Sequence, residues 1–506
     1  MLHPKSYKSG YPRPQFVRGS FKSLNGKWFF IDGGDPDNIF LSESSITVPF
    51  APECAASGIG KRESEKYVTY GRYVNLIKND RSKRIFLHFE GVDYSAELFV
   101  NGRYVSKHSG AFTRWSAEVT DVAVNGINKI VLRVYDTTGD GQVRGDQKPG
   151  GAGRYAPYSG IWKSVWTETV GRYCIRSISA QTRGDLLAVD VVTDCPHKFV
   201  IAAELRRGGE RVVKKAVSAG NCARIVLQMP SAVGWSCANP VLYDLRLALA
   251  VDKKIEDSVL SYVGFRDISV RDGMIAVGGK PEFLGTVLYS GCWENTGSTP
   301  PDEAAICRDV ELIKSMGFNC VLMHGKIGDE RFLYYCDVLG LNVLCEMPSV
   351  SELTAVAKRR YVSEWTRIIE LNRSHPCIIA WLPYAVADGA NAAERAFADE
   401  VSALTRSLDS RPTVCDGNAD SPKLADVECV IAPCGTASDI EDARLRLEKS
   451  LDSAVGDIKR GDGVCGWRYS QFADARRGDG GLLQADRSPK IPIDAVRQAV
   501  VKDRGL

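Results

Sequence analysis

The pattern of apolar residues along this chain changes once, near residue 269, and this change constrains the fold most. Before it, short segments alternate apolar and polar residues with a period of two, as in residues 84–91 and 130–135. After it, short apolar segments alternate with longer ones whose apolar residues recur every three or four positions, as in residues 303–316. The first pattern predicts stacked antiparallel sheets, and the second predicts parallel strands joined by helices.

The N-terminal half also carries turn signals between its predicted strands. Asn101 and Gly102 separate two alternating segments, and an Asn-Gly pair in this place is a strong hairpin signal because both turn residues adopt positive φ. A further strand, over residues 243–249, alternates cleanly. Many short strands with few helices predict a jelly-roll β-sandwich over residues 1–170 and an immunoglobulin-like β-sandwich over residues 171–268.

The C-terminal part repeats a strand followed by a helix. Residues 282–288, 319–323 and 342–347 predict strands, and residues 303–316 predict a helix between the first two. A parallel pair of strands needs such a crossover connection. We therefore expect a (β/α)₈ TIM barrel over residues 269–506, although roughly 240 residues is slightly short for eight full units.

The charge of the chain excludes some classes of partner. A net charge of +3 is close to neutral for 506 residues, so neither nucleic acid nor an anionic membrane is an expected partner. No segment approaches the roughly 18 apolar residues of a membrane span. Residues 1–7 lack the apolar core of a signal peptide.

The cysteine and histidine residues indicate neither disulfides nor a metal. The 15 cysteines are scattered without a C-x-x-C pair, which argues against zinc ribbons and a disulfide framework and fits a reducing compartment. We therefore expect the cytoplasm or another intracellular compartment. The six histidines show no paired spacing, and the phosphate-binding and dinucleotide-binding glycine motifs are absent, so no metal or cofactor is expected.

One stretch in the C-terminal part resembles a known catalytic segment. A predicted helix over residues 364–372 is followed by the turn Arg373-Ser374-His375-Pro376 and by a buried strand over residues 378–382. Together they resemble the acid/base strand of family 2 glycoside hydrolases, which include β-galactosidases, β-glucuronidases and β-mannosidases. In that family the pattern is roughly R-N-H-P-x-I-x-x-W-x-x-x-N-E.

The resemblance covers essentially the whole chain. Residues 11–15, 24–28, 91–93 and 158–162 match, in order and spacing, phrases of the family's sugar-binding domain. Residues 263–266 match the phrase that precedes the family's barrel. The resemblance implies a jelly roll, an immunoglobulin-like domain and a TIM barrel of catalytic type, with a carbohydrate as ligand.

Three departures from the family pattern affect its catalytic groups. Ala385 and Val386 occupy the Asn-Glu slot, and a valine cannot donate a proton. No Glu-aromatic-Gly phrase, which carries the family's nucleophile on the seventh strand, occurs between Val414 and the last strand. Leu322 stands where the family has an arginine that steadies the nucleophile. A retaining glycosidase needs two carboxylates about 5–5.5 Å apart, so these losses point to a catalytically degenerate member.

Several residues nevertheless remain candidates for the site. The candidate catalytic carboxylates are Glu346, Asp388 and Glu428. The candidate substrate-binding residues, whose aromatic faces or polar groups could hold a sugar ring, are His324, Trp381, Tyr384 and Trp467. For each aromatic residue, ordinary packing in the barrel is the alternative.

Three hypotheses about function follow. The first is a family 2 homologue that has lost glycosidase activity and acts as a carbohydrate-binding or protein-interaction subunit. The second is an active retaining β-glycosidase with relocated carboxylates, in which Asp388 or Glu346 is the acid and Glu428 the nucleophile. The third is a purely structural part of a larger assembly, with a filled barrel mouth and no ligand affinity.

Overall fold

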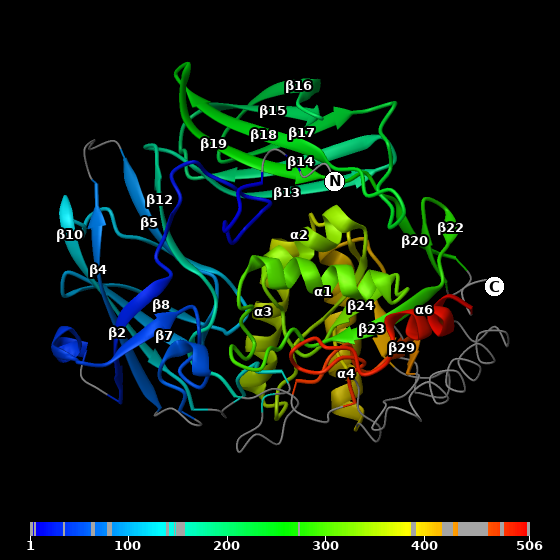
Figure 1. Cartoon of the computed structure of the whole chain (residues 1–506). Helices are drawn as coiled ribbons and strands as arrows, with labels where there is room; N and C mark the ends of the chain where they lie inside the picture. Colours follow the sequence, from blue (N-terminus) through cyan, green and yellow to red (C-terminus); the bar gives the residue numbers. More distant parts are fainter. Residues whose placement is uncertain are drawn as a thin grey trace.

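The computed structural model groups the chain into two β-sandwiches and a ring of parallel strands with helices around it (Figure 1). It describes residues 4, 7–33, 36–61, 66–77, 83–137, 141–145, 147, 157–271, 274–385, 391–416, 429–433, 464–475 and 480–502. In this part of the chain, no helix is long and apolar enough to cross a membrane. The two sandwiches and the ring of parallel strands confirm the β-rich multidomain fold predicted from the sequence.

The first sandwich consists of two main antiparallel sheets with strand orders β1-β12-β5-β9 and β3-β2-β4-β10-β7-β8. Its strands are β1 (Lys22–Ser23), β2 (Gly26–Asp32), β3 (Ser45–Val48), β4 (Tyr67–Leu76), β5 (Arg84–Phe89), β6 (Val92–Asp93), β7 (Ser95–Val100), β8 (Arg103–Ser109), β9 (Trp115–Glu118), β10 (Gly126–Tyr135), β11 (Gly160–Ile161) and β12 (Val165–Val170). The predicted hairpin joins β7 to β8, and both Asn101 (φ 53°) and Gly102 (φ 76°) have positive φ. Inward residues such as Trp28 and Leu98 form its core.

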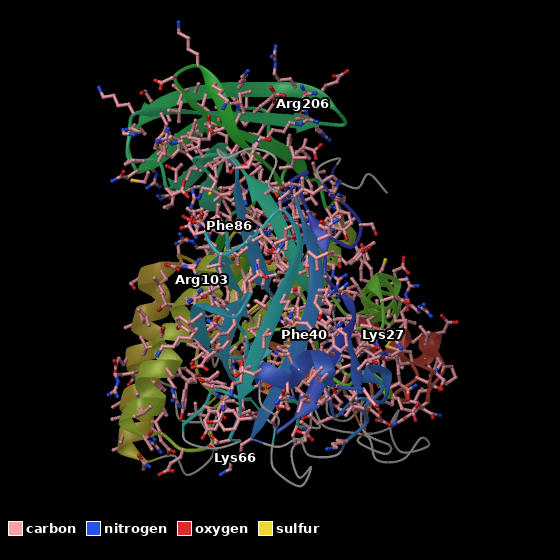
Figure 2. All side chains as sticks on the ribbon, turned by 90° about the vertical axis from the view of Figure 1, so that its left-hand side faces the viewer. Lys27, Phe40, Lys66, Phe86, Arg103 and Arg206 are labelled. Carbon is pink, nitrogen blue, oxygen red and sulfur yellow. The ribbon has the colours of Figure 1, made fainter. Side chains whose placement is uncertain are left out.

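The second sandwich packs beside the first. Its sheets have the orders β13-β14-β17 and β16-β15-β18-β19. Its strands are β13 (Ile175–Arg183), β14 (Leu186–Thr193), β15 (Phe199–Arg207), β16 (Glu210–Ala219), β17 (Cys222–Gln228), β18 (Tyr243–Val251) and β19 (Lys254–Val263). Phe86 of the first sandwich, labelled in Figure 2, packs with Val170 and Cys174 close to the start of the second, whereas Arg206 lies on the second sandwich.

Parallel strands form the third unit, and in the described part of the chain helices follow five of them. The strands are β23 (Leu284–Tyr289), β24 (Cys320–Met323), β25 (Asn342–Glu346), β26 (Ile378–Leu382), β27 (Val414–Asp416), β28 (Cys429–Pro433) and β29 (Val464–Tyr469). The helices are α1 (Glu303–Ser315), α2 (Glu330–Leu339), α3 (Ala355–Asn372), α4 (Ala392–Leu408) and α6 (Ile493–Lys502). A small sheet of β20 (Ile268–Arg271), β21 (Met274–Val277) and β22 (Lys280–Pro281) packs apolar residues against the barrel interior.

The parallel strands close into a ring of seven. Their order is β26-β25-β24-β23-β29-β28-β27, and a parallel bridge between Trp381 and Thr413 joins the two outer strands. The backbone N–H of Trp381 donates to the carbonyl oxygen of Pro412 at 3.0 Å across this junction. The prediction of eight strands is corrected for the part of the chain that the structure describes, because β28 pairs directly with β29. Residues 434–463, which connect these two strands, lie outside that part.

Strand register separates the inner face of the barrel from its outer face. Leu288, Leu322 and Leu344 lie side by side in neighbouring strands, and the latter two belong to the apolar cluster inside the ring. Residues of the opposite parity pack against the helices: Trp381 contacts Trp365 of α3 with ring centroids 5.5 Å apart. Inward residues at the carboxyl ends of the strands therefore form the barrel mouth.

Candidate functional site

Among the described residues, the barrel mouth contains one buried carboxylate on an inner-face position. Glu346 is the last residue of β25 and is only 4 % exposed. His324 follows the adjacent strand β24, and its Nδ1 atom lies 2.5 Å from Oε2 of Glu346. The backbone N–H of Gly325 donates to the same oxygen at 3.3 Å. The pairing of β24 with β25 brings these two candidates together, since side chains at the ends of neighbouring parallel strands share one edge.

This pair offers hydrogen-bonding groups but only part of a glycosidase. A carboxylate hydrogen-bonded to an imidazole can hold a sugar hydroxyl or pass on a proton. Capture of the anomeric carbon requires a second carboxylate about 5–5.5 Å away. Asp388 and Glu428, the other candidate carboxylates, lie outside the described residues, as does Val386.

The end of β26 has no acid among its described residues. Leu382 ends the strand on the inner face, and Pro383, Tyr384 and Ala385 follow. Ala385, in the slot of the family asparagine, is exposed and has no side chain that can form a hydrogen bond. Tyr384 is half-buried and packs against Phe397, with ring centroids 5.8 Å apart. Its role in binding a sugar stays a prediction.

Trp381 and Trp467 lie in the layer between strands and helices. Both indoles are completely buried, and Trp467 packs against Phe318 with ring centroids 5.9 Å apart. In register, Trp467 lies beside Gly285 on the outer face of the ring. The substrate contact predicted for the two tryptophans stays a prediction, and their burial favours the packing alternative.

Two residues on the inner face of the barrel, Leu322 and Arg468, bear on the predicted loss of the family arginine. Leu322, in the place of the family arginine, completes an aliphatic layer with its neighbours Leu288 and Leu344. Arg468 of β29 lies in register beside Thr286, on the inner face. Sequence reasoning did not single out Arg468, although an arginine within the otherwise apolar segment of β29 was a usable signal.

A loop of the first sandwich reaches the barrel mouth. Val143 forms a bridge with Val350, and the backbone N–H groups of Arg144 and Gly145 donate to the carbonyl oxygen of Ser349 at 3.2 and 3.0 Å. A Cβ atom on Gly145 would lie 1.7 Å from the carbonyl oxygen of Gly325, so only glycine fits there. Residues 141–145 therefore close against the ends of β24 and β25, beside the Glu346–His324 pair.

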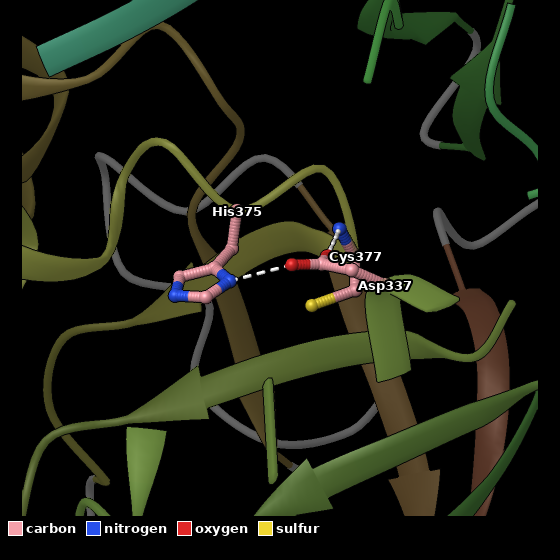
Figure 3. Close-up of side chains that lie close together, drawn as sticks. All are labelled: Asp337, His375 and Cys377. Atoms are coloured by element: carbon pink, nitrogen blue, oxygen red, sulfur yellow. Dashed lines mark hydrogen bonds and ion pairs between the residues drawn. The ribbon is translucent and has the colours of Figure 1, made fainter. Parts of the chain in front are cut away.

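A second titratable cluster lies at the opposite end of the strands (Figure 3). Asp337, His375 and Cys377 are completely buried, and their potential ligand atoms lie within 4.8 Å of one another. The Asp337 carboxylate accepts hydrogen bonds from the Tyr262 hydroxyl at 2.8 Å and the Cys377 backbone N–H at 2.8 Å, and it lies 2.6 Å from Nδ1 of His375. These bonds use the carboxylate to fasten α2 to the start of β26, which is a structural role.

Two kinds of sequence comparison relate the chain to glycosidases. A profile described as "Glycosyl hydrolases family 2, sugar binding domain" matches residues 45–169. A putative β-glucuronidase of Formosa agariphila is 28% identical over 397 residues, covering 74% of this chain and 47% of the relative. A β-galactosidase of Thermoanaerobacter pseudethanolicus is 24% identical over 438 residues, covering 80% and 57%. The chain thus spans about half the length of the curated relatives it matches.

Solved structures show the same fold. A β-glucuronidase of Bifidobacterium dentium, complexed with coumarin-3-O-glucuronide, superposes with a TM-score of 0.81. The alignment covers 99% of this chain and 98% of that protein at 18% identity. Similarity at this level of identity concerns the arrangement of the domains, while the site has to be judged from its own residues.

Proposed function

We propose that this chain is a member of glycoside hydrolase family 2 that has lost glycosidase activity and binds carbohydrate at the mouth of its barrel. It would act as a carbohydrate-binding or interaction subunit. The relatives are called β-glucuronidases and β-galactosidases, so β-glucuronides and β-galactosides are the first ligands to test.

The observation that carries the proposal is the direct pairing of β28 with β29. In the family, the nucleophile lies at the end of the seventh strand. Here β28, the sixth parallel strand along the chain, lies directly beside β29, the last one, in the sheet. The described ring therefore has no position between these two strands from which a seventh-strand glutamate could reach the mouth.

The remaining groups at the mouth support binding better than catalysis. Ala385 lacks an ionisable group, and the Leu322 layer has replaced the guanidinium that would face a nucleophile. Glu346 and His324 engage each other and can share their hydrogen bonds with a ligand hydroxyl.

The first test combines hydrolysis with binding. The purified chain is assayed against chromogenic β-glucuronides and β-galactosides, and the binding of the corresponding methyl glycosides is measured by calorimetry. We expect no turnover, and binding that Glu346→Gln weakens about tenfold, the equivalent of 1.4 kcal/mol for one lost charge-assisted hydrogen bond. Glu352→Gln, at an exposed position six residues further along, is the matched control and should bind like the parent.

Turnover would refute the proposal if it disappears in the double variant Asp388→Asn, Glu428→Gln. That result would establish the alternative, an active retaining β-glycosidase with relocated carboxylates. Absence of both turnover and binding would leave the purely structural role.

A further inference from the structure

A large cleft lies between the second sandwich and the amino ends of the barrel strands. Its volume is about 780 Å³, and its walls are the β13-β14-β17 sheet, the segment after β19, and the turns before β26 and β27. Figure 1 shows β13 and β14 on the side of the second sandwich that faces the barrel. Glu346 lies at the carboxyl ends of the strands and the cleft at their amino ends, so the two sites are separate.

The lining of this interdomain cleft is strongly cationic, unlike the nearly neutral chain as a whole. Asp267 and Asp409 are the acids in the lining, and Asp190, just beside it, lies 3.6 Å from Nε of Arg224, so three acids face an excess of arginines. The arginines that line it are Arg183, Arg224, Arg266, Arg373 and Arg411. A concave wall of one sign of charge concentrates field lines and attracts ions of the opposite sign.

On the barrel side, carbonyl oxygens hold the guanidinium groups in place. Arg411 donates to the carbonyl oxygens of His375 at 3.4 Å and Ile378 at 3.2 Å, and Arg373 donates to that of Leu408 at 3.0 Å. Carbonyl oxygens orient a guanidinium but carry no net charge, so the positive charge stays largely uncompensated. Asp409, 3.5 Å from Nε of Arg411, neutralises only one of these groups.

The same wall has spare hydrogen-bonding capacity. Arg266, His375 and Asp409 are 8 %, 0 % and 4 % exposed, and each has one buried polar atom without a hydrogen-bond partner among the described residues. These atoms are Nε of Arg266, Nε2 of His375 and Oδ2 of Asp409. Nε of Arg373 is a fourth such atom. Unsatisfied buried polar atoms are uncommon in native proteins, and four among the residues that line one cleft suggest a role in binding.

The sandwich side adds the groups that a sugar ring requires. Gln181 offers an amide group, while Leu186 and Val226 expose aliphatic surface between the arginines. This mixture suits a ligand that has hydroxyl groups, apolar C–H faces and a negative charge. The volume lies within the range of about 300–1,000 Å³ that is typical of small-molecule sites.

A neighbouring cavity extends the binding surface. It has a volume of about 320 Å³ and shares Arg373 and Ser374 with the cleft. Arg176 and Arg367 also line it. A ligand longer than one sugar unit could therefore pass from one cavity to the next along the seam between sandwich and barrel.

We propose that the interdomain cleft binds an anionic saccharide, one whose rings carry a carboxylate or sulfate ester group. Arg183 and Arg224 on the sandwich and Arg373 and Arg411 on the barrel contact the anionic group, and Gln181 contacts ring hydroxyls. The proposal does not depend on the one for the barrel mouth, because the two sites lie at opposite ends of the strands.

The test uses the full chain in calorimetric titrations at low ionic strength with chondroitin 4-sulfate disaccharide, a hexuronate–hexosamine disaccharide without sulfate, cellobiose and inorganic sulfate. We expect binding of the two anionic disaccharides and none of cellobiose. The sulfated and unsulfated probes distinguish recognition of the ester from recognition of the carboxylate. The variant Arg183→Gln, Arg224→Gln changes two exposed side chains and should weaken binding about tenfold or more through lost charge-assisted contacts.

The matched control is Arg207→Gln, Arg211→Gln, which removes two exposed arginines from the other sheet of the same sandwich. It should bind within twofold of the parent. Failure of both anionic disaccharides to bind, or equal binding by the cleft variant, would overturn the proposal. Equal affinity for inorganic sulfate would mean an adventitious ion only and would also overturn it. If the cleft variant loses affinity for the anionic disaccharides but keeps its affinity for β-glycosides, the loss concerns the cleft and not the function proposed for the barrel mouth.

Discussion

Replacing Glu364 by glutamine should stabilise the protein in a strongly pH-dependent way. Glu364 lies on α3, is buried against the first sandwich, and accepts a hydrogen bond from the Tyr94 hydroxyl at 3.1 Å through Oε1. Its other oxygen, Oε2, has no hydrogen-bond partner among the described residues. Burial, and secondarily the nearby negative charge of Asp93, raises the pKa of Glu364 to about 8. The carboxyl is therefore mainly protonated at pH 7.

The expected size of the effect follows from linkage between protonation and folding. The folded state retains a proton that the unfolded state releases above its ordinary pKa of 4.5, so stability falls as the pH rises from 4.5 to about 8. At pH 7 this amounts to slightly less than about 1.4 kcal/mol for each of roughly 2.5 pH units, because the folded carboxyl has begun to ionise, and so to about 3 kcal/mol. At pH 5 it is less than about 1 kcal/mol. Glutamine keeps the shape and the acceptor for Tyr94 without a proton to retain.

Urea unfolding, followed by tryptophan fluorescence at pH 5 and pH 7, measures this difference. We expect Glu364→Gln to raise the unfolding free energy by up to about 3 kcal/mol at pH 7 and little at pH 5. Glu370→Gln, at an exposed position of the same helix, should change neither value. Equal stabilisation at both pH values, or none at pH 7, would refute a neutral buried Glu364.

Three further changes test other parts of the structure. Tyr262→Phe removes the hydroxyl that donates to Asp337 at 2.8 Å and should cost about 1.5–3 kcal/mol in urea unfolding; an unchanged midpoint would show that the carboxylate does not need this bond. Gly145→Ala would place a Cβ atom 1.7 Å from a backbone oxygen, so we expect weaker glycoside binding at the barrel mouth, measured by calorimetry, and unchanged affinity would contradict closure of the loop there. Leu322→Ala in the barrel interior should cost about 2–5 kcal/mol by the same urea assay, against little for the exposed Leu41→Ala, and equal effects would contradict the packed aliphatic layer.

Local sequence signals predicted the elements of the fold well. The sequence predicted a change near residue 269 from sandwich strands to parallel strands with helices. In the structure the parallel strands begin with β23 at Leu284, after the small antiparallel sheet of β20, β21 and β22. The Asn101-Gly102 hairpin is present, and the helix predicted over residues 303–316 is α1 (Glu303–Ser315). These features depend on residues close together in the chain, so turn chemistry and periodicity are sufficient to reveal them.

The sequence was less informative about the face on which a barrel residue lies. Strands buried on both faces read as continuous apolar segments, so no alternation distinguishes inward from outward positions. Trp381 and Trp467 were thus candidates for the site, yet both pack in the strand–helix layer. Arg468, on the inner face, was not singled out. His324 and Glu346 were recognised separately, and only the pairing of β24 with β25 shows that they touch.

By itself, the sequence indicated the resemblance to family 2 glycoside hydrolases and the kinds of strands and helices, and it predicted that Val386 and Leu322 stand in the places of the family's acid/base residue and arginine. The tertiary structure decided that the described ring closes with seven strands, that the loop around Gly145 reaches the barrel mouth, and that arginines from two domains line one cleft. The physical reason is that these features arise between segments far apart in the chain. Strand pairing and domain packing fix them, and no local pattern of residues encodes such contacts.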